Sequence, residues 1–252
     1  IPARMGSSRF PGKPLCKING IPMIEHCYRR VELSKNINEV FLAICDPELE
    51  DFAIKKNFNY VMTDPIIQRP GLRVAEACKQ KKIYDDDIVV VMQGDEPLIS
   101  PSMIDKSITP FLKDTDNTIE IVNLCNEISE DEMNDPNEIK VVCDLDMNAM
   151  YMSRSFIPSI EHEEVRSKWY KQVCVMPFRW KTLKKLNFEL DITPLESQES
   201  IEMLRAMQHG IKVKMVVSDE STKSVDCEAD RIQVEKLMLN DIYFPKYVMK
   251  GR

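Results

Sequence analysis

A loop rich in cations opens the chain. The first fourteen residues join an apolar start to two glycines, two serines and the cations Arg4, Arg9 and Lys13. Glycine- and serine-rich turns expose backbone N–H groups, and arginine and lysine add charge-assisted donors, a combination that holds phosphate groups. A solvated basic turn is the alternative interpretation. Because the cations lie close together, beside glycines and directly after a strand-like start, we predict a polyphosphate site.

Two acidic segments are candidate metal ligands. Gln93-Gly94-Asp95 directly follows the apolar run 88–92, and Asp226 lies shortly before the last predicted helix. A hard cation such as Mg²⁺ takes few carboxylates and completes its coordination with phosphate oxygens and water. Each segment also has a simpler interpretation, as an acidic turn after residue 92 and as a helix N-cap at Asp226. The two carboxylates can share a metal only if the fold brings their segments together.

Composition excludes several classes of protein. The net charge of −7 argues against a nucleic-acid-binding protein, because a phosphate backbone attracts basic surfaces. A local cluster of cations can still bind a small anion. No apolar run has the length of a membrane span or of a secretory signal. The eight cysteines form no C-x-x-C pair, which is typical of buried thiols in a reducing compartment. We therefore predict a cytoplasmic protein that binds neither nucleic acid nor membranes.

Short apolar runs alternate with helical patterns along the chain. Strands are predicted at 40–45, 60–62, 88–92, 140–144, 150–153, 170–178 and 211–217, and helices at 49–56, 71–81, 195–209 and 230–238. This alternation is typical of an α/β protein with a doubly wound, mostly parallel sheet, which binds ligands at the carboxyl ends of its strands. The opening loop and Asp95 both fall there. We expect one domain over residues 1–252, with an inserted hairpin-rich lobe at about 127–200.

The opening motif resembles that of a known family. The sugar-acid cytidylyltransferases, above all those acting on 3-deoxy-manno-octulosonate (Kdo), begin with I-P-A-R-x-x-S-[ST]-R-[LF]-P-G-K-P-L, which this chain matches at 1–4 and 7–15. Their V-Q-G-D-E-P motif is similar to residues 91–97, and V-D-T-P-E-D is similar to 225–230. Further similarity at 19–24, 136–142, 151–158, 193–196 and 202–205 extends over nearly the whole chain. Because the match starts inside a strand, we expect a few residues before Ile1.

The resemblance implies a nucleotide-diphospho-sugar transferase-like, Rossmann-like fold and an enzyme that moves CMP from CTP to an acidic acceptor, by default a Kdo-type sugar acid. It also implies Mg²⁺ and a homodimer formed through the inserted lobe. The acceptor oxygen would attack the α-phosphorus without a protein nucleophile, so catalysis would be positioning and charge neutralisation. The implied roles are catalytic for Arg4, Lys13 and Asp95; nucleotide-binding for Pro2, Ala3, Arg4, Ser7, Arg9, Lys13, Arg69, Gly71 and Gln93; acceptor-binding for Gln93, Arg154, Gln172, Met176 and Glu202; and metal-binding for Asp95 and Asp226.

The departures from the family pattern concern the base and the acceptor. Residues 67–73 replace the family's H-x-S-G-T-x-R and keep only its arginine, Arg73. Gln172, Met176 and Met203 stand where the family has histidine, tyrosine and glutamine, so we expect Kdo itself to be a poor substrate. One alternative is a cytidylyltransferase for a smaller anionic acceptor, such as a phosphonate or another acid sugar. Another is a catalytically weak nucleotide-binding relative, although both carboxylates and Lys13 are present.

Overall fold

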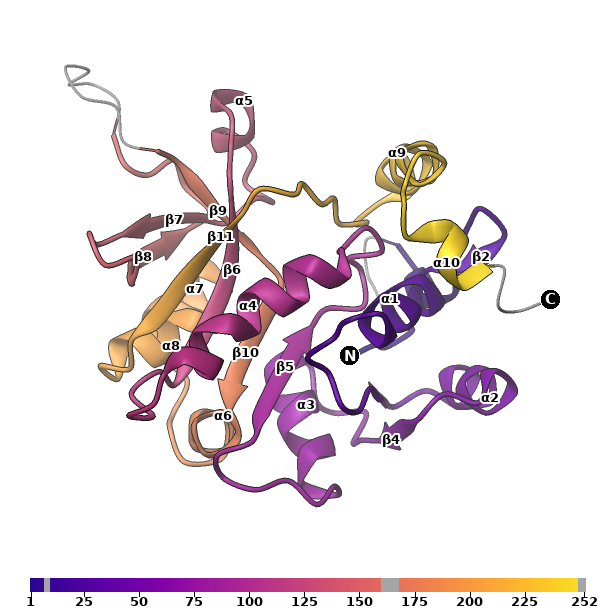
Figure 1. The fold of residues 1–252 in the computed structure, drawn as a ribbon, viewed down its shortest axis with the longest axis horizontal. Coiled ribbons are helices and arrows are strands. Elements are labelled where there is room, and N and C mark those ends of the chain that lie inside the picture. The colour runs from indigo at the N-terminus through magenta and orange to yellow at the C-terminus, as the bar shows by residue number, and fades with distance from the viewer. Residues whose placement is uncertain (7–9, 160–167, 249–252) are drawn as a thin grey trace. The chain divides into compact units, whose positions relative to one another are not determined.

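The structure is a computed structural model that describes residues 1–6, 10–159 and 168–248. Its chain divides into two compact units, shown in Figure 1. The first unit comprises Ile1–Ile83, Val91–Asp105 and Thr222–Arg252, and the second comprises Tyr84–Val90 and Lys106–Ser221. The lobe predicted at about 127–200 falls within the second unit. The predicted single-domain organisation stays a prediction.

The first unit begins with the phosphate-loop candidate and ends with two helices. Its elements are the short 3₁₀ helix η1 (Lys13–Leu15), the strands β1 (Lys17–Ile18), β2 (Ile21–Pro22), β3 (Leu42–Ile44) and β4 (Tyr60–Met62), and the helices α1 (Met23–Glu32), α2 (Pro47–Lys56), α3 (Pro70–Lys79), α9 (Glu228–Met238) and α10 (Phe244–Val248). The strand β5 (Ile88–Met92) and the helix α4 (Pro101–Lys113) each run from the range of one unit into that of the other.

Parallel pairing in the first unit involves the very start of the chain. β3 pairs with β4 in parallel, and an isolated parallel bridge joins Pro2 to Ala43 of β3. The backbone N–H of Ala3 donates to the Ala43 carbonyl at 3.0 Å, and that of Ala43 donates to the Ile1 carbonyl at 2.9 Å. The residues before the cation-rich loop are therefore fixed at the edge of β3.

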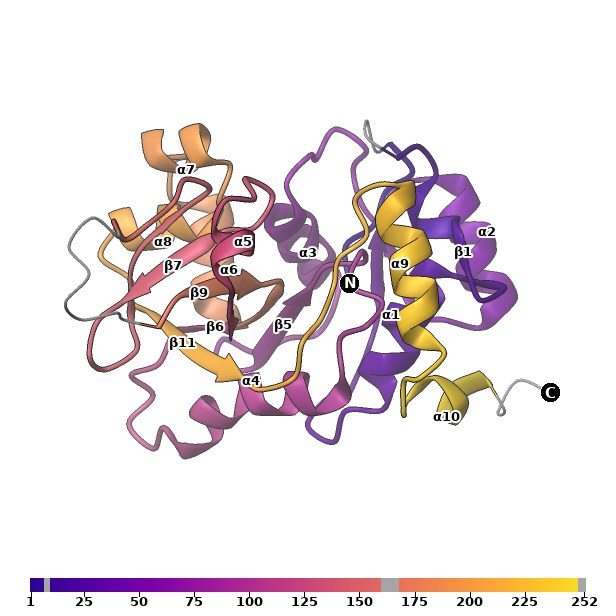
Figure 2. The same ribbon diagram turned by 90° about the horizontal axis from the view of Figure 1, so that it is seen from above.

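A small core cluster ties the end of the chain to its beginning. Ile18, Met23, Val225, Val234 and Met238 are all buried together, and α9 lies beside β1 (Figure 2). Burial of such side chains is the main stabilising contribution to folding. This packing brings the segment around Asp226 to the opening segment of the chain.

The second unit is built on a mixed sheet. Its order is β5-β10-β6-β9-β7-β8, with β11 beside β6. The bounds are β6 (Ile121–Glu127), α5 (Glu130–Met133), β7 (Lys140–Cys143), β8 (Ala149–Ser153), β9 (Tyr170–Val173), β10 (Val175–Arg179), α6 (Trp180–Phe188), α7 (Pro194–Glu199), α8 (Met203–Gln208) and β11 (Val213–Ser218). β11 and β6 are parallel, whereas β7 and β8 form the predicted antiparallel hairpin. The predicted α/β class is confirmed.

One predicted strand and one predicted helix are each split in two. The strand expected at 170–178 breaks at Cys174, where the side-chain amide of Asn123 donates to the Val173 carbonyl at 2.8 Å and satisfies it. The helix expected at 195–209 breaks at Ser200, which adopts a left-handed φ of 55°. In one continuous helix Glu196 and Arg205 would lie about 13 Å apart along the axis. The break instead lets them form a buried ion pair at 2.7 Å.

Candidate active site

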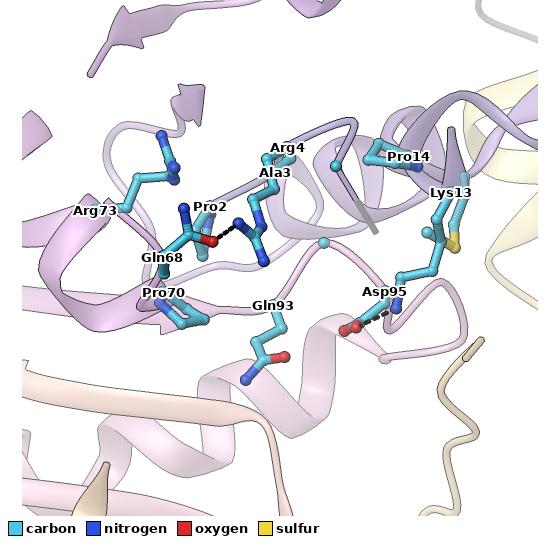
Figure 3. A pocket seen from close by; sticks show the side chains of 13 residues that line it. Pro2, Ala3, Arg4, Lys13, Pro14, Gln68, Pro70, Arg73, Gln93 and Asp95 are labelled. Carbon is cyan, nitrogen blue, oxygen red and sulfur yellow. Dashed lines mark hydrogen bonds and ion pairs between the residues drawn. The ribbon is translucent and has the colours of Figure 1, made fainter. Parts of the chain in front are cut away.

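A pocket of about 260 Å³ lies within the first unit. Three segments line it: the opening residues with η1 and the start of α1, the loop that leads into α3, and the turn that follows β5 (Figure 3). Six of the residues predicted from the sequence to bind substrate or metal are in its lining. The full lining is Pro2, Ala3, Arg4, Gly6, Lys13, Pro14, Met23, Gln68, Pro70, Arg73, Gln93, Gly94 and Asp95.

The opening loop is fastened to its surroundings by backbone groups. Asp46 is the N-cap residue of α2, but its carboxylate makes no capping bond and instead accepts from the Met5 N–H at 2.9 Å. Gly12 has a φ of 71°, in the left-handed region that favours glycine, and its N–H donates to the Met5 carbonyl at 3.3 Å. This turn directs the chain into η1, which begins with Lys13.

Lys13 brings the two predicted metal ligands together. Its Nζ donates to Asp95 Oδ2 at 2.7 Å and to Asp226 Oδ1 at 3.2 Å. Burial alone would lower the pKa of Lys13, but the charges and hydrogen bonds of the two carboxylates outweigh it, so the pKa is raised. The Val225 N–H also donates to the Asp95 carbonyl at 2.9 Å, which joins the two segments through their backbones.

The interpretation of Asp226 as a helix N-cap is wrong. α9 begins at Glu228 with Cys227 as its N-cap, so Asp226 lies one residue further out. The N–H groups of Asp226 and Cys227 both donate to Asp230 Oδ2 at 3.1 Å. Asp230 thus does the capping, and the Asp226 carboxylate is turned to Lys13. Glu96 is buried and accepts from the Thr222 hydroxyl at 3.0 Å, which gives it a structural role.

Two polar side chains of the pocket, Gln68 and Arg73, were not predicted as site residues. Arg4 Nη1 donates to the Gln68 side-chain carbonyl, which places a guanidinium beside a neutral amide (Figure 3). Arg73 is buried and donates to Thr63 Oγ1 and to the Ile67 carbonyl, so it anchors the loop that carries Gln68. Their position in the segment 67–73, which replaces the family's S-G-T loop, could have indicated from the sequence that Gln68 and Arg73 belong to the site.

The other nucleotide-site predictions have different outcomes. Arg69 is the N-cap of α3 and Gly71 lies in its first turn, and neither is in the pocket lining. Pro70 stands between them and does line the pocket. Ser7 and Arg9 lie outside the described residues.

Four of the predicted acceptor residues, Arg154, Gln172, Met176 and Glu202, belong to the second unit. Arg154 follows β8 and is held by Glu199: the Arg154 N–H donates to Glu199 Oε2 at 2.9 Å, and its Nε donates to the Glu199 carbonyl at 2.9 Å. Its Nη1 donates to the Pro136 carbonyl at 3.1 Å. These bonds fix the guanidinium between the end of β8 and the segment before β7.

Gln172 and Met176 lie together on the sheet. Gln172 Nε2 donates to Asn123 Oδ1 and lies 3.6 Å from the sulfur of Met176. Met176 is buried, as is Met203, the first residue of α8. Glu202 is the N-cap residue of α8. The structure thus groups Gln172 with Met176 and places Arg154 and Glu202 on other elements of the same unit.

Comparison with known proteins identifies the class. A family model described as cytidylyltransferase matches residues 1–223. An 8-amino-3,8-dideoxy-manno-octulosonate cytidylyltransferase from Shewanella loihica is 37% identical over 91% of this chain and 93% of its own. A 3-deoxy-manno-octulosonate cytidylyltransferase from Hydrogenovibrio crunogenus is 36% identical over 94% of this chain and 96% of its own.

Solved structures agree with this result. CMP:2-keto-3-deoxy-manno-octonic acid synthetase, in its complex with CTP, is 32% identical, with a TM-score of 0.87 over 96% of this chain and 97% of that one. A 4-diphosphocytidyl-2C-methyl-D-erythritol synthase from Anaerococcus prevotii shares the fold, with a TM-score of 0.62 at 17% identity, over 95% of each chain. The fold is that of the nucleotidyltransferases. The chain belongs to the cytidylyltransferase family, as the motifs predicted.

The carboxylates at the pocket suit a metal ion whose coordination shell is completed by oxygen atoms of the substrate. The family generally depends on a divalent metal. Within residues 1–6, 10–159 and 168–248, no three His, Cys, Asp or Glu side chains form a metal-binding group. Asp95 and Asp226 place two carboxylates around one cation, Lys13, and a pair of carboxylates fits a hard divalent cation whose remaining ligands are substrate phosphates and water. In the same described ranges, no helix has the length and apolar character needed to span a bilayer.

Proposed function

We propose that this cytidylyltransferase transfers CMP from CTP to an octulosonic sugar acid of the Kdo type and releases pyrophosphate. The observation that carries the proposal is one pocket that holds Arg4, Lys13, Gln93 and Asp95, with Asp226 bonded to the same lysine. The relatives named above support the acceptor class, because both are named for octulosonates. A related structure contains CTP.

In this mechanism the protein positions two anions, the triphosphate of CTP and the acidic acceptor, and its cations reduce the electrostatic repulsion between them. Arg4 and Lys13 bind the triphosphate, and the backbone at Pro2 and Ala3 forms the adjoining wall of the pocket. An oxygen of the acceptor attacks the α-phosphorus, and pyrophosphate leaves with its charge compensated by the cations. We assign Asp95 and Asp226 as the ligands of Mg²⁺, which when bound supplies Lewis-acid neutralisation of phosphate charge. We also assign contacts with the nucleotide to Ser7, Arg9, Arg69 and Gly71, and contacts with both substrates to Gln93.

For the acceptor we propose Arg154 as the partner of its carboxylate, since a fixed guanidinium suits a planar anion. Glu202 would accept from a sugar hydroxyl. Gln172 and Met176 would line the acceptor site in place of the family's histidine and tyrosine. Because the Gln172 amide already donates to Asn123, it has fewer hydrogen bonds to give to the sugar than a histidine would have. We therefore expect a low kcat/KM for Kdo.

The experiment is a matrix of pyrophosphate release with four nucleoside triphosphates against Kdo, 8-amino-Kdo and a small phosphonate. Turnover with CTP and an octulosonate is the expected result. If the enzyme prefers the phosphonate, the acceptor is a small anion and not an octulosonate. If no pair of substrates is turned over, the protein is a nucleotide-binding relative without activity. The double substitution Gln172→His with Met176→Tyr should raise kcat/KM for Kdo by about tenfold, the value of one regained hydrogen bond.

We further propose that the enzyme is a homodimer joined through the lobe at about 127–200. The hairpin of β7 and β8 carries two large apolar side chains in solvent, Leu145 and Met150. Two exposed apolar side chains on one hairpin would suit a protein–protein contact if they form a continuous patch. Light scattering should report a dimer, and Leu145→Asp with Met150→Asp should give a folded monomer. A monomeric wild type would contradict the proposal.

A further inference from the structure

Lys13 occupies the position between the two carboxylates that the proposed function assigns to a metal. Its Nζ lies 2.7 Å from Asp95 Oδ2 and 3.2 Å from Asp226 Oδ1. The three side chains are only 14%, 21% and 27% exposed, so water screens these contacts weakly. Without ligands, the ammonium group is therefore the counter-ion of both carboxylates.

The same lysine is also assigned to the triphosphate, and it cannot fill both roles from one position. Mg²⁺ binds carboxylate oxygens at about 2.0–2.1 Å. An ammonium that stayed in contact with the same two oxygens would lie within a few ångströms of a divalent charge, where Coulomb repulsion is strong. Binding of the metal between Asp95 and Asp226 therefore requires the ammonium to leave.

The surroundings of Lys13 let its side chain move while its backbone stays in place. The Lys13 N–H donates to the Phe10 carbonyl at 3.1 Å, and the Lys13 carbonyl accepts from the Cys16 N–H at 3.2 Å. The ammonium itself is at the end of a flexible four-carbon stem. Arg4 differs, because its partner in the pocket is the neutral amide of Gln68 (Figure 3). Arg4 therefore does not compete for the carboxylates.

We propose that Lys13 is an exchangeable internal counter-ion that couples the binding of metal to the binding of nucleotide. The metal displaces the ammonium from Asp95 and Asp226, and the displaced ammonium becomes available to the phosphates. This inference rests on the proposed metal site and goes beyond it, because it gives Lys13 opposite effects on two ligands. Removal of the lysine charge weakens nucleotide binding and tightens metal binding to the nucleotide-free protein.

The first experiment measures Mn²⁺ affinity of the nucleotide-free protein by electron paramagnetic resonance. Lys13→Gln should bind Mn²⁺ about tenfold more tightly than wild type, because a competing charge is gone. Lys17→Gln removes an exposed lysine from β1 and should leave the Mn²⁺ affinity unchanged. Asp226→Asn should lose most of the Mn²⁺ affinity. The CTP affinity of Lys13→Gln, measured by titration calorimetry, should fall.

A second experiment uses the wild-type chain and so does not depend on the folding of a variant. The rate at which an acylating reagent modifies Lys13 is followed by peptide mass spectrometry, with and without Mg²⁺ and without nucleotide. Modification of Lys13 should be several-fold faster with Mg²⁺, because the metal releases the ammonium from its carboxylates. Modification of Lys17 should not change.

The outcomes separate this inference from the proposed function. If Asp226→Asn abolishes Mn²⁺ binding but Lys13→Gln binds no more tightly than wild type, the metal site stands and the exchange is wrong. An unchanged rate of Lys13 modification on addition of Mg²⁺ would overturn the exchange as well. If neither Asp95→Asn nor Asp226→Asn alters Mn²⁺ binding, the proposed metal site itself is wrong, and the inference fails with it.

Discussion

At the scale of single residues, the pocket pairs its cations with different partners. Lys13 is bonded to two carboxylates, whereas Arg4 is bonded to an uncharged amide. In the nucleotide site that we propose, a triphosphate would meet the Arg4 guanidinium, whose charge is not neutralised by its Gln68 partner. The lysine charge is balanced until the carboxylates take another cation. Whether the charge of Lys13 is available to a nucleotide therefore depends on what the two carboxylates bind.

The first prediction concerns these carboxylates. Asp95→Asn and Asp226→Asn should each lower kcat/KM on the order of 100-fold or more, since each removes a charged metal ligand. The fold should persist, because neither side chain is in the core. Glu228→Gln, which neutralises an exposed carboxylate two residues from Asp226, is the matched control and should keep its activity. Near-wild-type turnover in either aspartate variant would contradict the metal assignment.

Sequence motifs predicted which residue types form the site, but not all of their contacts. Arg4, Lys13 and Asp95 were predicted from local patterns and Gln93 from the family resemblance, and all four line one pocket. The simplest local interpretation of Asp226 was an N-cap, which is wrong because Asp230 bonds the N–H groups there. A capping preference is local, whereas the contact of Asp226 with Lys13 depends on the packing of α9 beside β1. Gln68 was missed because an amide carries no chemical signature of its own.

At the scale of elements, the turn after β5 must pass very close to the opening strand. A Cβ on Gly94 would lie 2.8 Å from Ile24 Cδ1 and 3.1 Å from the Pro2 carbonyl oxygen. Both distances are shorter than ordinary contacts, and one of the atoms is backbone. Gly94 therefore lets the Gln93–Asp95 turn approach the residues that wall the pocket.

Gly94→Ala should accordingly destabilise the protein by about 1–3 kcal/mol, as overpacking does, and it should weaken CTP binding because Pro2 must shift. Gly6→Ala is the matched control: Gly6 also lines the pocket, but a Cβ there would meet nothing within 4 Å. Denaturant unfolding and calorimetry with CTP provide the measurements. Equal effects of the two substitutions would show that the close approach at Gly94 has no energetic consequence.

The contact between α1 and α10 depends on a buried histidine. His26 Nδ1 lies 2.8 Å from the Tyr247 hydroxyl, and its Nε2 lies 2.9 Å from the Ile18 carbonyl oxygen. Burial lowers the pKa of His26 from 6.5 to about 4. The neutral ring therefore donates through Nε2 to Ile18 and accepts from Tyr247 through Nδ1.

This pKa predicts how stability depends on pH. Between about pH 6.5 and pH 4 the unfolded chain binds a proton at His26 that the folded chain does not. The stabilising contribution of neutral His26 is thus complete above pH 6.5 and is lost as the pH falls toward 4, by up to about 3 kcal/mol. In thermal unfolding, His26→Gln should show a shallower loss of Tm over this range than wild type. His209→Gln, at an exposed histidine, should keep the wild-type slope.

The element pattern was predictable only in part: β6, α4 and α6 were not predicted, and one predicted strand and one predicted helix are each split. The strands at 60–62 and 88–92 match β4 and β5 to the residue. The breaks at Cys174 and Ser200 were not predictable from periodicity, because they are compensated by Asn123 and by the Glu196–Arg205 pair. Asn123 is distant in the sequence from the break at Cys174, and the pair of Glu196 with Arg205 forms only when the helix is broken between them.

At the scale of the whole molecule, the chain distributes its chemistry over two units. The proposed nucleotide pocket and both proposed metal ligands belong to the first unit, and the proposed acceptor residues Arg154, Gln172, Met176 and Glu202 belong to the second. The first unit keeps the opening motif and the Gln93–Asp95 motif but departs from the family at 67–73, and the departures at Gln172, Met176 and Met203 fall in the second unit. Variation therefore affects both the loop at 67–73, beside the proposed nucleotide site, and the residues that we assign to the acceptor.

The most direct test of the account follows the α-phosphorus of CTP. With α-³²P-labelled CTP, Mg²⁺ and an octulosonate of the Kdo or 8-amino-Kdo type, the label should move into a CMP–sugar acid as unlabelled pyrophosphate appears in equal amount. Asp226→Asn should stop both. Label that stays in CTP with every octulosonate, or that is released only as free CMP, would contradict the assignment of this chain as an enzyme that activates octulosonic acids.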